Sequence, residues 1–315
     1  MRHVLNIAAP TFRTVVLTPV LLLALAASGC TKDPPIPDGS SLAPATETPP
    51  NVPGIPNAPN PNVLNAATRP FADYSLLAWS DEFDGSALDG RKWRPEVKDV
   101  WYNNELQATT ASRSNLGVAG GNLLLTAQRE ALNGRQYTSA RIVTKGLKSF
   151  LYGRIDTRAK LPKGKGMWPA IWMLGANDSQ VSWPACGEID IMELKGSQPT
   201  LNISTLHFGA TVAAHQYQSG TYTLPQPPAG PAVDFSTDFH VFTVIRSLNT
   251  IRWYLDGNLY YTRSSAEVSP YPFNNPFYMI LNVAVGGDFD GNPDATTVFP
   301  QAMQVDYVRY FKYAE

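Results

Sequence analysis

Short runs in which apolar and polar residues alternate recur along the chain after residue 70. These runs have the length of β-strands, are rich in β-branched and aromatic residues, and are separated by Gly, Pro and Asn. Asp256-Gly257 lies between two of them and predicts a tight β-hairpin, whereas no segment has the periodicity of a long amphipathic helix. The pattern therefore predicts an all-β sandwich, with strands at 122–127, 153–161, 167–174, 188–194, 202–208, 240–245, 250–255, 258–262, 278–285 and 304–311.

Residues 1–29 have the composition of a signal peptide. Arg2 and Arg13 precede an apolar run over 15–27, which is short for a membrane-spanning helix and is followed by small residues. Ala-Ser-Gly-Cys at 27–30 resembles a bacterial lipobox, which predicts that Cys30 is acylated and becomes the mature N-terminus. We therefore expect an exported lipoprotein of the outer membrane or cell surface. The alternative is cleavage nearby and release as a soluble secreted protein.

Residues 30–70 are dense in Pro, Ala, Asn, Ser and Thr and show no hydrophobic period. We expect them to form an extended tether between the lipid anchor and a catalytic domain at 71–315. If Cys30 is acylated, Cys186 is the one remaining cysteine in the sequence and no intrachain disulfide can form. A formal net charge of −1 and a pI of about 6.4 provide no basic surface, so we exclude nucleic-acid binding.

Three carboxylates, Glu188, Asp190 and Glu193, lie in one predicted strand. Side chains alternate faces along a strand, so Glu188 and Asp190 share one face while the intervening isoleucines point into the core. Glu193 joins the two other acids only if a β-bulge near Met192 absorbs one extra residue. The gap between the two glutamates would then be near the roughly 5 to 5.5 Å of a retaining glycosidase. A solvated face or a cation site is the alternative, although like charges on one strand face repel each other.

The segment 183–193, Trp-Pro-Ala-Cys-Gly-Glu-Ile-Asp-Ile-Met-Glu, resembles the signature of glycoside hydrolase family 16 in the bulged ExDxxE form of laminarinases. Two positions depart from the family pattern: Ile245-Arg246 replaces the usual Glu-Trp, and Phe289 follows Gly-Gly-Asp where laminarinases commonly have Trp. Further segments that resemble the family in order are 79–83, 103–107, 138–142, 152–154, 166–175, 206–209, 238–240, 253–257, 282–287 and 305–310.

The resemblance implies a concanavalin-like β-jelly roll of two antiparallel sheets with an open concave cleft. Glu188 would be the nucleophile and Glu193 the acid/base, with no metal or other cofactor required for the chemistry. Asp190 would share a proton or hydrogen bond with Glu188 and separate the pKa values of the two glutamates. We expect the negative charges of its two neighbours to raise the pKa of Glu193.

Aromatic rings and a few polar groups are expected to bind the sugar. Core packing is the alternative for each tryptophan, and a structural role is the alternative for the histidine. The candidate sugar-binding residues are Trp168, Trp172, Trp183, Asn103, Glu105, Arg141 and His207. The family resemblance also suggests a structural calcium ion at Glu82, Gly121 and Asp306.

The leading hypothesis is an exported, monomeric endo-β-1,3-glucanase that cleaves laminarin-like β-glucan with retention. Hydrolysis of a galactan such as agar or carrageenan, or of a mixed-linkage glucan, is the alternative within the same family. A β-glucan-binding lectin is the alternative from another class, and the intact Glu188 and Glu193 argue against it.

Overall fold

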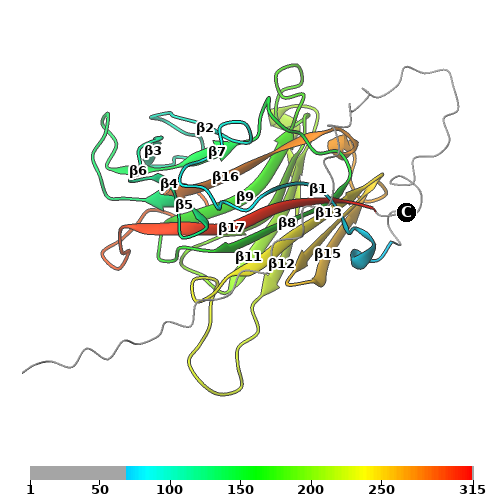
Figure 1. Ribbon diagram of the computed structural model, residues 1–315. Coiled ribbons are helices and arrows are strands. Elements are labelled where there is room, and N and C mark those ends of the chain that lie inside the picture. The colour runs from blue at the N-terminus through cyan, green and yellow to red at the C-terminus, as the bar shows by residue number, and fades with distance from the viewer. Residues whose placement is uncertain (1–68, 314–315) are drawn as a thin grey trace, which may run out of the picture. The chain divides into compact units, whose positions relative to one another are not determined.

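The computed structural model describes residues 69–313, which fold into two large antiparallel sheets with almost no helix (Figure 1). The predicted all-β sandwich is therefore confirmed. Three short 3-10 helices occur among the described residues: η1 (Phe71–Asp73), η2 (Val212–Ala214) and η3 (Pro272–Asn274). No helix among residues 69–313 is long and apolar enough to cross a membrane. Cys30, the expected signal peptide and nearly all of the expected tether lie outside the described residues.

One layer is an eight-stranded sheet. In spatial order it contains β15 (Asn258–Ser264), β14 (Thr250–Leu255), β13 (His240–Ser247), β8 (Gly153–Lys160), β17 (Gln301–Lys312), β5 (Asn122–Ala127) and β4 (Leu116–Ala119), and β1 (Leu76–Asp81) also pairs with β17. The C-terminal strand β17, red in Figure 1, is central because β8 pairs along one edge while β5 and β1 share the other.

The second layer is a seven-stranded sheet. Its order is β12 (Gln216–Thr223), β11 (Leu201–Phe208), β10 (Glu188–Leu194), β9 (Met167–Gly175), β16 (Phe277–Val285), β7 (Arg141–Val143) and β2 (Arg94–Pro95). A small parallel pair, β3 (Gln107–Thr109) and β6 (Tyr137–Ser139), is separate from both layers. The acid-bearing strand β10 is thus an interior strand, paired on both edges.

The core is one buried cluster of apolar side chains contributed by both sheets. Ile189, Ile191 and Met192 of β10 belong to it, as do Val244 and Trp253 of the eight-stranded sheet, and each is at most 1% exposed. Burying a side chain of this size contributes roughly 1.5 to 3 kcal/mol relative to leaving it in water. The core therefore determines which face of β10 is turned inward and leaves the other face to the carboxylates.

The departure at Ile245-Arg246 is explained by packing at one end of β13. Ile245 lies in a small second apolar cluster, and Arg246 is only 2% exposed. The Arg246 guanidinium donates hydrogen bonds of 2.7–2.9 Å to the carbonyl oxygens of Phe150, Phe273 and Asn275. Burial lowers the pKa of Arg246 to about 10, so the group remains charged at neutral pH. Arg246 thus ties η3 and its flanks to the sandwich.

Candidate active site

Strand β10 carries all three carboxylates, and its pairing shifts by one residue within the motif. Asp190 pairs with Trp172 of β9 and Glu193 pairs with Ala170, so three steps on β10 correspond to two on β9. The pairing with β11 shifts in the same way. One residue of β10 is therefore extra, as in a β-bulge, and Glu193 is turned to the side of Glu188 and Asp190. We call these three residues the acidic face.

Two backbone carbonyl groups at the bulge accept hydrogen bonds from side chains. Trp253 of β14 donates its indole N–H to the Asp190 carbonyl oxygen at 3.0 Å. Ser204 of β11 donates its hydroxyl to the Ile191 carbonyl oxygen at 2.7 Å. Because Trp253 comes from the opposite sheet, the bulge is attached to the core itself. The sequence motif indicated neither of these two supporting residues.

Gly187, directly before the motif, lies too close to Pro272 to carry a side chain. Gly187 has φ 81°, and a Cβ atom there would lie 2.8 Å from Cγ of Pro272 in η3. Only glycine adopts this conformation readily and leaves that space. Since Arg246 of the opposite sheet holds η3, that sheet helps to set where the chain enters Glu188.

Glu193 is 9% exposed and accepts a hydrogen bond of 3.0 Å from the indole N–H of Trp168. The Trp168 ring stacks on Phe289, with centroids 4.8 Å apart and planes at 24°. Lys195 covers Phe289, its Nζ lying 4.9 Å from the ring centroid. Phe289, the second departure from the family pattern, thus supports the tryptophan that orients Glu193. One face of Trp168 is occupied by protein, so this residue positions Glu193 in addition to any contact with sugar.

His207 of β11 pairs with Glu188 across the strands. Its Nε2 lies 3.3 Å from Oδ2 of Asp190 and 3.8 Å from Oε1 of Glu188, and ligand-type atoms of the three residues lie within 4.8 Å of one another. Trp183 adds a side-chain hydrogen bond to Glu188. The structure therefore brings His207 and Trp183 to the Glu188 end of the acidic face.

The pKa values of all three acids are raised. Burial is the largest cause for Glu188 and Glu193, and the charge of Asp190 is the next, which together raise the pKa of each glutamate to about 8. Burial raises the pKa of Asp190 well above its usual range. The expected rise in the pKa of Glu193 is thus present, with burial as its largest cause and the charge of Asp190 as the next.

Trp172 and Arg141 lie on the same side of the sheet as the acids. Trp172 pairs with Asp190 and donates its indole N–H to Oδ1 of Asn282 at 2.7 Å. The Arg141 guanidinium lies between two indole rings, 4.7 Å from that of Trp172 and 4.5 Å from that of Trp101. Arg141 pairs with Asn282, Asn282 with Ala170, and Ala170 with Glu193, so three strand spacings, roughly 14 Å, separate Arg141 from Glu193.

Asn103 and Glu105 lie in a loop packed against the end of β16. The backbone carbonyl of Asn103 accepts a hydrogen bond from the Asp288 amide at 2.9 Å, one residue before Phe289. The Glu105 carboxyl accepts from Nε2 of Gln107 at 2.6 Å, and burial raises its pKa. These two residues contact the loop that supports Trp168 rather than the acids themselves, so their sugar contacts stay a prediction.

The residues suggested for calcium already have cationic partners. Arg309 contacts both carboxylate oxygens of Glu82 at 2.9–3.3 Å, and Arg158 donates to Oδ2 of Asp306 at 2.8 Å. Gly121, at φ 70°, forms the turn between β4 and β5. A calcium ion would need several oxygen ligands and would compete with both arginines. Its binding stays a prediction.

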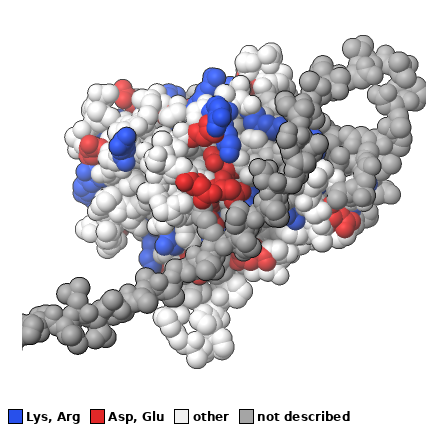
Figure 2. Space-filling model, in the orientation of Figure 1, with Lys and Arg blue, Asp and Glu red and all other residues white. Residues whose placement is uncertain are grey.

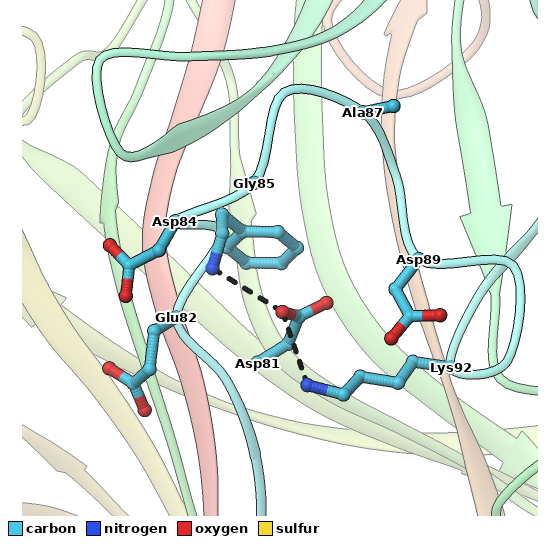
Figure 3. A pocket seen from close by; sticks show the side chains of 8 residues that line it. Asp81, Glu82, Asp84, Gly85, Ala87, Asp89 and Lys92 are labelled. Atoms are coloured by element: carbon cyan, nitrogen blue, oxygen red, sulfur yellow. Dashed lines mark hydrogen bonds and ion pairs between the residues drawn. The ribbon is translucent and has the colours of Figure 1, made fainter.

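A second acidic cluster lines a pocket of 310 Å³ beside β1, remote in sequence from β10 (Figure 3). Its central residue is Asp81, which accepts hydrogen bonds from the Phe83 amide at 3.3 Å and from Nζ of Lys92 at 3.4 Å. The indole N–H of Trp93 donates to the same carboxylate at 2.9 Å. Figure 3 shows Glu82 and Asp84 pointing to the side opposite Lys92. We call this the β1 pocket.

A two-layer β-sandwich that holds three carboxyls on one face of one strand, two glutamates with a buried aspartate between them, defines a glycoside hydrolase type of site. The family model described as "Beta-porphyranase A-D, GH16 domain" matches residues 75–313. The chain therefore belongs to glycoside hydrolase family 16.

Similar proteins agree with this assignment. The chain is 42% identical over 273 residues to the beta-glucanase of Rhodothermus marinus, which covers 81% of this chain and 91% of that protein. It is 38% identical over 292 residues to glucan endo-1,3-beta-glucosidase A1 of Niallia circulans, covering 82% of this chain but only 42% of that longer protein. The crystal structure of the laminarinase catalytic domain from Thermotoga maritima MSB8 aligns with a TM-score of 0.70 at 41% identity, covering 76% of this chain and 98% of that chain. This likeness confirms the predicted jelly-roll class.

Proposed function

We propose that this protein is a monomeric endo-β-1,3-glucanase that hydrolyses laminarin-like β-glucan with net retention. The observation that carries the proposal is the acidic face, on which Glu188 and Glu193 are brought to one side of β10 by a single extra residue. The named activities of the Niallia circulans and Thermotoga maritima relatives support the substrate class.

In the proposed double displacement, a carboxylate oxygen of Glu188 attacks the anomeric carbon while Glu193 transfers its proton to the departing glycosidic oxygen. Water then attacks the glycosyl-enzyme, gives one proton to Glu193 and releases Glu188 as a carboxylate. A proton kept on Asp190, whose pKa is well above its usual range, removes one negative charge from the acidic face. Glu188 can then ionise while Glu193 keeps its proton.

Reducing-end release from laminarin, lichenan, agarose, carrageenan and porphyran in parallel tests the substrate. We expect laminarin to be cleaved fastest and lichenan next. The match to a β-porphyranase family model favours a second candidate, a galactan hydrolase with the same acids. Faster release from porphyran, agarose or carrageenan would select that candidate. Binding of laminarin without any release would instead indicate a lectin.

Glu193→Ala tests the assigned roles. An aryl β-glucoside with an activated leaving group should still form the glycosyl-enzyme in this variant, because its leaving group needs little protonation. Added azide should rescue turnover and yield the β-glycosyl azide, since two inversions restore the configuration. In the control Glu188→Ala the same azide would attack directly and give the α-anomer. An α-azide from Glu193→Ala would contradict double displacement.

We further propose that the protein is exported and anchored through an acylated Cys30, with residues 30–70 as the tether. The lipobox-like sequence before Cys30 supports this proposal. Radiolabelled palmitate should enter the wild-type protein and Cys186→Ala but not Cys30→Ala, which should leave the membrane fraction and remain active. Absence of label in the wild type would favour a soluble secreted enzyme.

A further inference from the structure

His215, which follows η2, is linked to the acidic face through the imidazole of His207. Its Nε2 lies 2.8 Å from Nδ1 of His207, and the two rings are nearly parallel, at 18° with centroids 5.0 Å apart. The Trp183 ring packs on His215, with centroids 4.6 Å apart. The Tyr217 ring of β12 packs on His207, with centroids 5.9 Å apart. The imidazole pair is therefore held on several sides by aromatic rings.

The hydrogen bond between the two histidines decides which nitrogen of His207 carries a proton. A neutral imidazole has one N–H donor and one acceptor nitrogen. If Nδ1 of His207 donated to His215, the lone pair of Nε2 would face the carboxyl oxygens of Asp190 and Glu188, which are 3.3 and 3.8 Å away. If His215 donates from Nε2 instead, His207 presents its own Nε2–H to both acids. Only the second arrangement suits an ionised carboxylate.

Asp190 needs this donor. Its Oδ2 is buried and makes no hydrogen bond of standard geometry among residues 69–313, and Nε2 of His207 lies 3.3 Å from it. The titratable groups that face the imidazole pair are Glu188, Asp190 and, farther along β10, Glu193, together with Tyr217 from β12. Burial and the neighbouring His207 lower the pKa of His215, which keeps it neutral and able to donate without adding a charge.

We propose that His215 is a positioning residue: it donates its Nε2–H to His207 and thereby holds His207 in the tautomer that directs Nε2–H toward Asp190 and Glu188. This inference rests on the proposed glycosidase function but concerns a residue outside the ExDxxE motif. Stabilising the ionised carboxylate of Glu188 in this way favours its attacking form, while Asp190 keeps its proton. His215 touches no reacting atom and acts through His207.

Two substitutions separate donation from packing. His215→Phe keeps a ring against Trp183 but removes the N–H, and His215→Gln supplies an amide N–H in its place. With the fastest-cleaved polysaccharide, we expect His215→Phe to move the acidic limb of the kcat/KM profile to higher pH by about one unit, with KM changed less than twofold. His215→Gln should restore most of the shift. His240→Gln, which removes a histidine paired with Asp256, is the control and should leave the limb in place.

Nitrogen-15 NMR of the histidine side chains gives a readout that needs no substrate, and the sequence contains only four histidines. We expect His207 to carry its proton on Nε2 in the wild type and to lose this preference in His215→Phe. The proposal would be overturned if His215→Phe left the His207 tautomer unchanged or left the acidic limb of the kcat/KM profile in place. It would also be overturned if His215→Phe lost activity without a shift of that limb and His215→Gln did not restore the activity. If no polysaccharide is cleaved, the proposed function fails while the NMR result still decides the role of His215.

Discussion

The protein contains two clusters of carboxylates with opposite electrostatic character: the acidic face on β10 and the β1 pocket. In the β1 pocket Asp89 pairs with Arg91 at 2.9 Å, and hydrogen bonds from that arginine lower the pKa of Asp89 to about 2. Figure 2 shows acidic side chains gathered near the middle of the face of view with Lys and Arg beside them. On the acidic face the pKa values of Glu188 and Glu193 are raised to about 8.

The difference between the two clusters comes first from burial and then from the available donors, and not from the number of acids. Asp81 in the β1 pocket has an indole N–H, a backbone amide and a lysine within 3.4 Å. Each glutamate of the acidic face has one indole donor, and its nearest charged neighbour on the strand is another carboxyl. Burying a carboxylate without enough hydrogen-bond donors costs free energy. Such a cost is tolerated where the chemistry requires a carboxyl that keeps its proton.

The largest effect is expected from Glu188→Gln. Removing the attacking charge without changing the shape should lower kcat by roughly four orders of magnitude or more, while glucan binding is retained. The same substitution removes a largely buried charge that has no Lys or Arg partner among residues 69–313, so the thermal midpoint at pH 8 should rise. Turnover assays and calorimetry on one preparation check both results. Near-normal turnover would refute the assignment of Glu188 as the nucleophile. A lower thermal midpoint would refute the electrostatic contrast between the acidic face and the β1 pocket.

The next effect concerns stability against pH. Glu188 and Glu193 bind protons more tightly when folded, so their stabilisation is fully present below about pH 4.5 and is lost as the pH rises toward 8. Asp89 has the opposite sign: its stabilisation is present above about pH 3.8 and is lost as the pH falls toward 2. Urea unfolding of the wild type and of Glu188→Gln/Glu193→Gln at pH 5, 6.5 and 8 should show a difference that grows with pH. A constant difference would contradict this prediction.

Much of the sandwich was predictable because its central strands bury one face in a shared core. The predicted runs at 122–127, 188–194 and 250–255 coincide with β5, β10 and β14. β12 was not predicted, because its sequence Gln-Tyr-Gln-Ser-Gly-Thr-Tyr-Thr is largely polar and it forms the edge of its sheet. β2, β3, β6 and β7 have only two or three residues each, too few for a periodicity to be visible.

The acids of the site could be predicted from spacing, but their environment could not. A strand period and one bulge are local properties, so Glu188, Asp190 and Glu193 could be placed together from the sequence. Desolvation is a tertiary property, so the sequence did not indicate that burial is the largest cause of the raised glutamate pKa values. Trp253, Ser204 and His215 escaped prediction for the same reason, since only the folded chain brings them to β10 and β11.

In the β1 pocket, Asp81→Ala should reduce stability and leave catalysis intact. The substitution removes the acceptor of the Trp93 indole N–H, and Trp93 is fully buried. An unsatisfied buried donor costs about 1 to 3 kcal/mol, so the free energy of unfolding should fall by that amount. Asp84→Ala, at an exposed position of the same pocket, is the matched control and should change it little. Loss of turnover in Asp81→Ala at a temperature where it is folded would mean that the two clusters are coupled.

The smallest effect should come from Trp168→Phe, which makes the acidic face even poorer in donors. The Trp168 indole N–H lies 3.0 Å from Oε1 of Glu193 and lowers the pKa of that carboxyl, while Phe can keep the stack on Phe289. Removing the N–H should therefore raise the pKa of Glu193 further and move the basic limb of the kcat/KM profile upward by about half a unit. Trp172→Phe is the matched control, because its indole N–H is bonded to Asn282 instead of an acid, and its basic limb should stay in place. A downward shift in Trp168→Phe, or an equal shift in both variants, would show that the indole donor does not set the protonation of Glu193.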